Sequence, residues 1–184
     1  MKNTTTWLIV LAALFLIGGY LFFHKSTTAP HTAVSQTPAT FDGRNSTFTI
    51  DNKPVTLSNG VSRVAAAPGS SSMVTTRYFG NEATGDLNGD GLPDVAFLIT
   101  QDMGGSGVFY YVVVALASAN GYKTTNAFFI GDRIAPQPTD IHSDKLYVNF
   151  ADRKPGEPMT AQPSVGTTLA LKVTPAGVLE GLMK

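Results

Sequence analysis

Two apolar segments near the middle of the chain constrain its fold more than any other feature of the sequence. Residues 95–100 and 108–117 are almost uninterrupted apolar runs that are rich in β-branched side chains. Such runs are typical of strands that are buried on both faces. The glycine-rich segment 103–107 between them is long enough for a hairpin loop. We therefore expect two central, antiparallel strands.

Shorter segments of strand character lie on both sides of this pair. They are 46–50, 53–57, 73–79, 122–130, 140–142, 145–150, 165–174 and 178–182. Turn signals such as Asp51-Asn52 and Asn120-Gly121 separate them at short intervals, and no long segment has a helical period. The sequence thus predicts an all-β fold with a mainly antiparallel, meandering sheet, in which 81–84 is a short connection. Residues 61–67 are ambiguous, and one short helix there would make the domain α+β.

The N-terminus predicts one transmembrane helix. Residues 7–23 form an uncharged apolar run, preceded by Lys2 and followed by Lys25. At ~1.5 Å rise per residue, this run is just long enough to cross ~30 Å of hydrocarbon. We expect residues 1–25 to be an uncleaved signal anchor in the inner membrane, with the C-terminal domain periplasmic or extracellular. A cleaved signal peptide is the alternative, although the apolar run exceeds the length usual for one.

The composition of the remaining chain limits its partners. Residues 26–42 are rich in Ser, Thr, Ala and Pro and predict a flexible linker, which leaves an extracytoplasmic β domain at 43–184. The 13 basic and 13 acidic residues give a formal net charge of zero. Because the basic residues are scattered, we expect no nucleic-acid partner. The chain has no cysteine, which excludes disulfides, thiol catalysis and a lipid anchored on cysteine.

The segment 86–94 predicts a calcium loop. Calcium takes six to eight oxygen ligands from carboxylates, amides, backbone carbonyls and water. In this segment side-chain oxygens occur at positions 1, 3, 5 and 9, and a glycine at position 6 permits a sharp bend. The expected ligands of a structural calcium ion are Asp86, Asn88, Asp90, the carbonyl of Leu92, and Asp94. A polar cluster of β-turns is the alternative, since Asn-Gly and Asp-Gly are ordinary turn dipeptides.

The context of the loop distinguishes it from an EF-hand. An EF-hand needs a glutamate at position 12, where this chain has Phe97. The pattern Asp-x-Asn-x-Asp-Gly-x-x-Asp leading into a strand, over residues 84–99, resembles the calcium loops of FG-GAP and VCBS-type repeats. Because the chain has a single copy, the resemblance does not imply a propeller. Residues 131–137 and 147–159 resemble uncharacterised bacterial membrane-anchored envelope proteins, which implies an envelope location but no activity.

The remaining polar residues form no recognised catalytic motif. Residues 104–107, Gly-Gly-Ser-Gly, lack the lysine of a P-loop and the spacing of a nucleophile elbow. We expect a non-enzymatic, membrane-tethered binding or structural module whose partner is an unknown envelope protein or ligand. An envelope hydrolase with a site near Asp132, Arg133 and His142 is the alternative, and it requires an Asp–His pair within hydrogen-bond reach. An assembly protein such as a minor pilin is a third, less favoured possibility.

Overall fold

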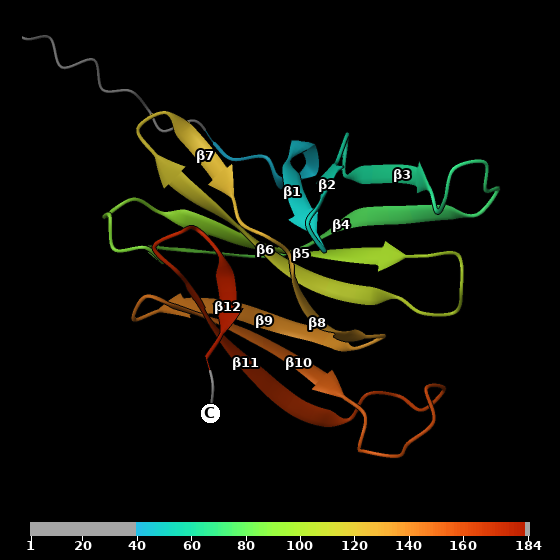
Figure 1. Cartoon of the computed structure of the whole chain (residues 1–184). Coiled ribbons are helices and arrows are strands. Elements are labelled where there is room, and N and C mark those ends of the chain that lie inside the picture. The colour runs from blue at the N-terminus through green and yellow to red at the C-terminus, as the bar shows by residue number, and fades with distance from the viewer. Residues whose placement is uncertain (1–39, 183–184) are drawn as a thin grey trace, which may run out of the picture. The chain divides into compact units, whose positions relative to one another are not determined.

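Residues 40–182 are described by a computed structural model, and they form an all-β domain of antiparallel sheets (Figure 1). The fold class expected from the sequence is therefore confirmed. Helical structure in this part of the chain is limited to a 3-10 turn, η1 (Gly43–Asn45). None of its helices is long and apolar enough to cross a membrane. The expected anchor 1–25 and most of the linker 26–42 lie outside the described residues.

A six-stranded sheet forms the middle of the domain. Its order is β3 (Val61–Ala65), β4 (Met73–Gly85), β5 (Asp94–Asp102), β6 (Phe109–Ser118) and β7 (Gly121–Thr124), with β8 (Phe128–Asp132) paired to the first half of β6. The strands β5 and β6 form the predicted central hairpin, in which Leu98 pairs with Val112. Residues 96–99 and 112–115 have no exposed surface. The prediction that both faces of these strands are covered is thus confirmed.

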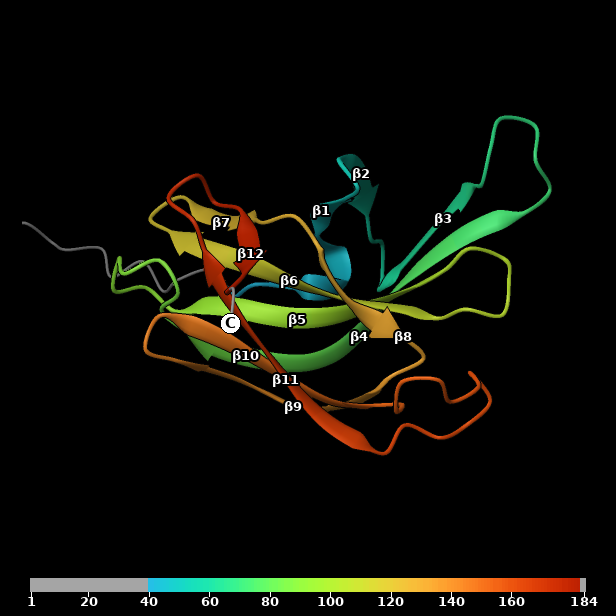
Figure 2. The same ribbon diagram turned by 60° about the horizontal axis from the view of Figure 1, so that its bottom comes forward.

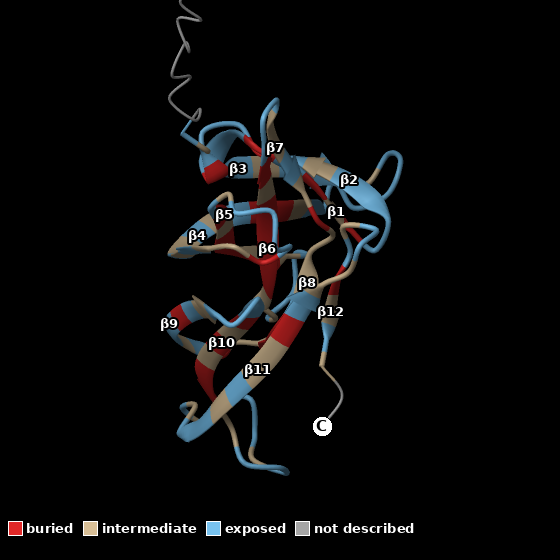
Figure 3. Ribbon diagram, turned by 90° about the vertical axis from the view of Figure 1, so that its left-hand side faces the viewer, coloured by how far each residue is buried: buried red, intermediate tan, exposed pale blue. Residues whose placement is uncertain are grey.

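A second sheet covers one face of this middle layer. Its order is β12 (Leu179–Gly181), β11 (Val165–Val173), β10 (Lys145–Asp152) and β9 (Ala135–His142). The core between the two sheets is mostly aliphatic and includes Leu98, Val112, Leu146, Val148 and Leu171. Figure 3 shows the two layers edge-on, with many of the buried residues on β6 and β10.

A hairpin of β1 (Thr47–Ile50) and β2 (Lys53–Thr56) covers the opposite face (Figure 2). This second core is largely aromatic. The ring of Phe97 lies 5.6 Å from that of Phe41, 6.2 Å from that of Phe48 and 5.8 Å from that of Tyr78. Phe41, from the last residues of the predicted linker, therefore packs against this core.

Side-chain amides link the two sheets at their margins. At one margin, Asn81 donates to the carbonyl of Gln137 at 2.7 Å and to the hydroxyl of Thr139 at 3.0 Å. At the other, the Asn126 side chain accepts from the amide of Leu179 at 2.8 Å and donates to its carbonyl at 3.2 Å. Each link joins residues more than 50 positions apart in the sequence. The sheets therefore form one continuous domain.

Several segments differ from the predictions, and β9 begins at Ala135 instead of residue 140. Residues 61–65 pair with β4 as a strand, so the short helix considered for 61–67 is wrong. Residues 81–84 belong to β4, where shifts in its pairing with β5 accommodate them, and are not a connection. The predicted strand 122–130 is divided into β7 and β8, because these pair with different halves of β6 and residues 125–127 cross between them.

Candidate metal site

The predicted calcium loop connects β4 to β5, at the left of Figure 1. It is a series of tight turns in which Gly89 and Gly91 have φ angles of 77° and 81°. Glycine adopts this left-handed backbone without strain. The sharp bend expected at Gly91 is therefore present.

The carboxylate of Asp86 lies at the centre of these turns. Its Oδ1 accepts from the amide of Gly89 at 2.7 Å, and its Oδ2 accepts from the amide of Gly91 at 2.8 Å. The bonds from backbone amides, led by that of Gly91, hold the pKa of Asp86 below its ordinary value. The loop thus keeps a negative charge at its first ligand position at neutral pH.

The side chains of Asn88 and Asp90 form the next turn. The amide of Asp90 donates to Asn88 Oδ1 at 3.0 Å, and the amide of Leu92 donates to Asp90 Oδ1 at 2.8 Å. The amide nitrogen of the Asn88 side chain donates to Asp90 Oδ2 at 3.0 Å. Asn88 and Asp90 are exposed. Since a carboxylate oxygen has more than one lone pair, Asp90 retains acceptor capacity for a cation.

The carboxylate of Asp94 differs because it is fully buried. Its Oδ2 accepts from the amide of Leu87 at 2.9 Å, and its Oδ1 accepts from the amide of Ala117 at 2.8 Å. The first bond closes the loop on itself. The second fastens the loop to the end of β6, so Asp94 has a structural role whether or not it also binds a metal.

The carboxylates of Asp86 and Asp90 influence that of Asp94. Burial is the largest cause of the raised pKa of Asp94, and the charges of Asp90 and Asp86 raise it further, while the amides of Leu87 and Ala117 oppose the shift. At Asp94, burial and the acidic neighbours therefore outweigh the two amide donors. A cation bound beside this carboxylate would oppose the shift.

The ligand types of the loop fit calcium, which favours carboxylate, amide and carbonyl oxygens. Among residues 40–182, no group of three or more His, Cys, Asp and Glu side chains is arranged to hold a metal ion. The three expected aspartate ligands, Asp86, Asp90 and Asp94, are therefore not arranged as such a group, while the Asn88 side chain and the Leu92 carbonyl are outside those residue types. The convergence of all five ligands on one centre remains a prediction of the sequence.

A groove of about 420 Å³ lies beside the loop. Residues 87–89 form one wall, the turn 143–145 between β9 and β10 forms another, and residues 172–175 form a third. Lys172 is paired with Glu180 at 3.1 Å, so its charge is already neutralised locally. The groove places exposed polar groups, among them Asp144, beside the loop.

The residues of the alternative hydrolase site are separated in the structure. Asp132 and Arg133 form an ion pair at 3.0 Å just before β9, whereas His142 ends that strand and stacks on Tyr147, with ring centroids 4.1 Å apart. The length of β9, at ~3.3 Å per residue, places His142 roughly 20 Å or more from Asp132. The structure therefore does not bring together the Asp–His pair that this alternative requires.

Sequence reasoning did not identify the role of Arg153. Its Nε donates to the carbonyl of Ala161 at 2.7 Å, and its Nη1 donates to the carbonyl of Arg133 at 3.0 Å. The side chain thus holds the loop between β10 and β11 against the segment between β8 and β9. These acceptors are backbone carbonyls distant in the sequence, and no local pattern signals them.

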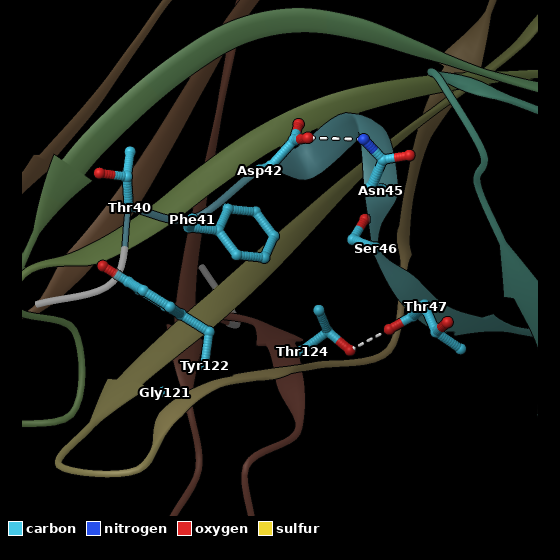
Figure 4. A pocket seen from close by; sticks show the side chains of 9 residues that line it. All are labelled: Thr40, Phe41, Asp42, Asn45, Ser46, Thr47, Gly121, Tyr122 and Thr124. Atoms are coloured by element: carbon cyan, nitrogen blue, oxygen red, sulfur yellow. Dashed lines mark hydrogen bonds between the residues drawn. The ribbon is translucent and has the colours of Figure 1, made fainter.

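A second hollow, of about 380 Å³, lies where the described chain begins (Figure 4). The rings of Phe41 and Tyr122, 5.2 Å apart, form one side of it. Several of its polar side chains are already hydrogen-bonded: Asn45 donates to Asp42, and Thr124 donates to the carbonyl of Thr47. The hollow thus offers few free polar groups that would select a ligand.

Comparison with known protein families, with curated proteins and with solved structures finds no match to this chain.

Proposed function

We propose that the chain is a membrane-tethered, extracytoplasmic module of the bacterial envelope that binds a structural calcium ion and has a binding or structural role without catalysis. The ion would be held by Asp86, Asn88, Asp90, the carbonyl of Leu92, and Asp94. It would supply the positive charge that the loop lacks. The apolar run 7–23 supports the tether, and the flexible composition of 26–42 supports a spacer between the membrane and the domain.

The observation that carries the proposal is the electrostatic state of Asp94. Asp94 is buried, has two acidic neighbours and has no cationic side chain among its interactions, so its ionised form is destabilised. A divalent cation in the loop would stabilise that ionised form. Extracellular calcium modules commonly have dissociation constants of about 10⁻⁴–10⁻³ M. At such affinities the ion stabilises the fold by mass action instead of switching it.

Thermal unfolding of the full chain in detergent, with calcium and with EGTA, tests the calcium site. At about 100 times Kd, calcium should stabilise the domain by about 2.7 kcal/mol, which corresponds to a rise in Tm of roughly 5–10 °C. Magnesium should have a much smaller effect, because it prefers strict octahedral geometry and retains its water. An identical Tm with calcium and with EGTA would refute the calcium site.

A pair of matched variants distinguishes the loss of a calcium ligand from the loss of a negative charge elsewhere in the domain. Asp90→Asn removes a proposed ligand, and it should abolish the calcium-dependent rise in Tm. Asp51→Asn removes an exposed aspartate from the turn between β1 and β2, whose φ of 49° asparagine tolerates. This control should keep the full rise. Equal responses of the two variants would contradict the assignment of Asp90.

Membrane fractionation tests the tether independently. The full chain should remain in the membrane pellet after washing with high salt, because a transmembrane helix is not released by screening of charges. A chain that begins at residue 26 should be released. Release of the full chain by salt would contradict the anchor and leave the calcium site unaffected.

A further inference from the structure

The hairpin of β3 and the first half of β4 extends away from the rest of the domain (Figure 2). The second sheet contacts β4 further along that strand, where the Asn81 side chain bonds to β9. Four of the nine large apolar side chains that are exposed in the described chain belong to the hairpin: Val61, Val64, Met73 and Phe79. Such grouping is typical of a surface that contacts a protein or a membrane.

Two arginines share one face of the hairpin with three of these apolar side chains. Val61 pairs with Arg77, so both point to the same side, and alternation along the strand places Arg63 there too. The ring of Phe79 reaches this side as well, since it contacts Tyr110 at 5.4 Å, and Tyr110 is in line with Arg77 across β5. We call this surface the arginine face, and it consists of Val61, Arg63, Met73, Arg77 and Phe79.

The positive charges of the arginine face are not neutralised by neighbouring acids. Residues 61–80 contain no Asp or Glu. Within residues 40–182, neither Arg63 nor Arg77 takes part in an ion pair. One carboxylate, Asp102, lies on the neighbouring strand opposite Thr75, and it accepts from a backbone amide of its own loop. The face thus presents two positive charges, and complementarity favours an anionic partner.

We propose that the arginine face contacts an anionic lipid bilayer, the membrane that holds the proposed tether. In this contact the guanidinium groups bind lipid phosphates, and the apolar side chains beside them enter the boundary between headgroups and acyl chains. Arginine suits this boundary, because its stem lies along apolar surface while its charged end stays in the polar layer. A bilayer is favoured over a soluble polyanion because it takes up both kinds of side chain at once.

The inference rests on the proposed tether and not on the calcium site. A flexible linker over 26–42 would span roughly 20 Å. The first described residues lie beside the hairpin, since the carbonyl of Arg44 accepts from the amide of Gly60, just before β3, at 2.7 Å. The domain would therefore meet the bilayer at high effective concentration, where a weak contact suffices. Each arginine should strengthen it about fivefold, and loss of both should weaken it about 25-fold.

Fluorescence of a single label on vesicles tests the contact, because the chain has no cysteine of its own. Full-length Met73→Cys, labelled with nitrobenzoxadiazole, is reconstituted in EGTA at no more than one chain per vesicle, so a second copy cannot cover the face. The vesicles contain equal parts of phosphatidylglycerol and phosphatidylcholine. A nitroxide lipid should quench this label about threefold more than the same label on Met159→Cys. That control lies in the loop between β10 and β11, away from β3 (Figure 1).

Two charge variants show whether the arginines carry the contact. Arg63→Gln with Arg77→Gln should remove the excess quenching of the label at residue 73. Lys145→Gln with Lys154→Gln removes the same charge from exposed positions in and after β10 and should keep the excess. Vesicles of phosphatidylcholine alone should also lack it. Circular dichroism in detergent confirms that every variant is folded.

The outcomes separate this inference from the tether on which it rests. A chain that does not float with the vesicles after washing with high salt overturns the tether and this proposal with it. A chain that floats, but whose label at residue 73 is quenched no more than that at residue 159, overturns this proposal alone. Quenching that survives the loss of both arginines does the same. A label that responds to soluble polyglutamate and not to anionic lipid would assign the face to an acidic protein and also overturn the proposal.

Discussion

Two carboxylates hold the two ends of β6, and their surroundings are opposite in charge. Before the strand, Asp132 Oδ1 accepts from the amide of Val108 at 2.9 Å, and near its end Asp94 Oδ1 accepts from the amide of Ala117 at 2.8 Å. Asp132 has the guanidinium of Arg133 at 3.0 Å. Asp94 has instead the charges of Asp86 and Asp90 nearby.

The pKa values of the two groups follow this difference. Burial raises the pKa of Asp132, but the hydrogen bonds from Arg133 and Val108 outweigh it and leave that pKa below the ordinary value. For Asp94, burial and the acidic neighbours outweigh the amides of Leu87 and Ala117, and its pKa is raised. Both carboxylates thus fasten an end of β6, but a positive side chain balances the charge of Asp132 and none balances that of Asp94. The unbalanced end is the one where the sequence predicts calcium.

Truncation of the two side chains should have the largest and most unequal effect. Asp94→Ala leaves two buried amides without acceptors and should lower the free energy of unfolding by about 3–5 kcal/mol. Asp132→Ala, at a partly exposed site, should cost about 1–2 kcal/mol. Urea unfolding of the full chain, without calcium, measures both. Equal losses would contradict the distinction between the buried and the partly exposed carboxylate.

Bound calcium should balance the charge around Asp94, as Arg133 does around Asp132. It should do so only while the carboxylates that bind it are ionised. At pH 7 and about 100 times Kd the expected gain is about 2.7 kcal/mol. As the pH falls towards 4, protons compete for Asp94, whose pKa is raised, and the gain should diminish. The difference in Tm with calcium and with EGTA, measured at several pH values, checks this. A gain that is the same at pH 4 as at pH 7 would indicate binding elsewhere.

Without calcium, the contributions of Asp132 and Asp94 to the free energy of unfolding should change with pH in opposite directions. The folded pKa of Asp132 is lowered, so its contribution is complete above its unfolded pKa and is lost as the pH falls through the folded value. The folded pKa of Asp94 is raised, so its contribution is complete below its unfolded pKa and is lost as the pH rises through the folded value. Unfolding of Asp132→Asn between pH 2 and 5 should show a weaker loss in acid, by at most about 1 kcal/mol. The same acid dependence as in the unmodified chain would show that the ion pair contributes nothing.

The smallest expected effect concerns the repulsion within the loop. In EGTA at pH 7, Asp90→Asn removes a charge that disfavours ionised Asp94, so the Tm should stay unchanged or rise by about 1–2 °C. With calcium the same variant should lie below the unmodified chain. A fall in Tm in EGTA would show that the hydrogen bonds of Asp90 outweigh the repulsion.

Local pattern was sufficient to predict the fold class, the central hairpin and the bends of the loop. It failed at 81–84, where Asn81 and its neighbours read as a connection. In the structure Asn81 has a φ of 52° inside the irregular part of β4, and its side chain bonds to β9. That partner lies 56 residues away, so no local window contains the reason for the strand.

The candidate site shows the same limit. The spacing of oxygens identified Asp94 as a member of the loop, and the structure places it at the end of that loop. Its bond to Ala117, 23 residues further along the chain, depends on how β5 and β6 align and is invisible in the motif. The role of Arg153 was missed for the same reason, since its acceptors are carbonyls of other loops.

The complete burial of the β5–β6 hairpin has a consequence for how its alignment is chosen. Where one face of a strand is exposed to solvent, a register shift by one residue exposes its apolar side chains to water and is therefore unfavourable. In 96–99 and 112–115 every residue is apolar and both faces of the strands are buried. The burial of apolar side chains alone therefore hardly distinguishes the observed register from a shifted one. The hydrogen bonds of Asp94 and Asp132 to the two ends of β6 form in one register only. They would therefore favour that register over those shifted by one or two residues.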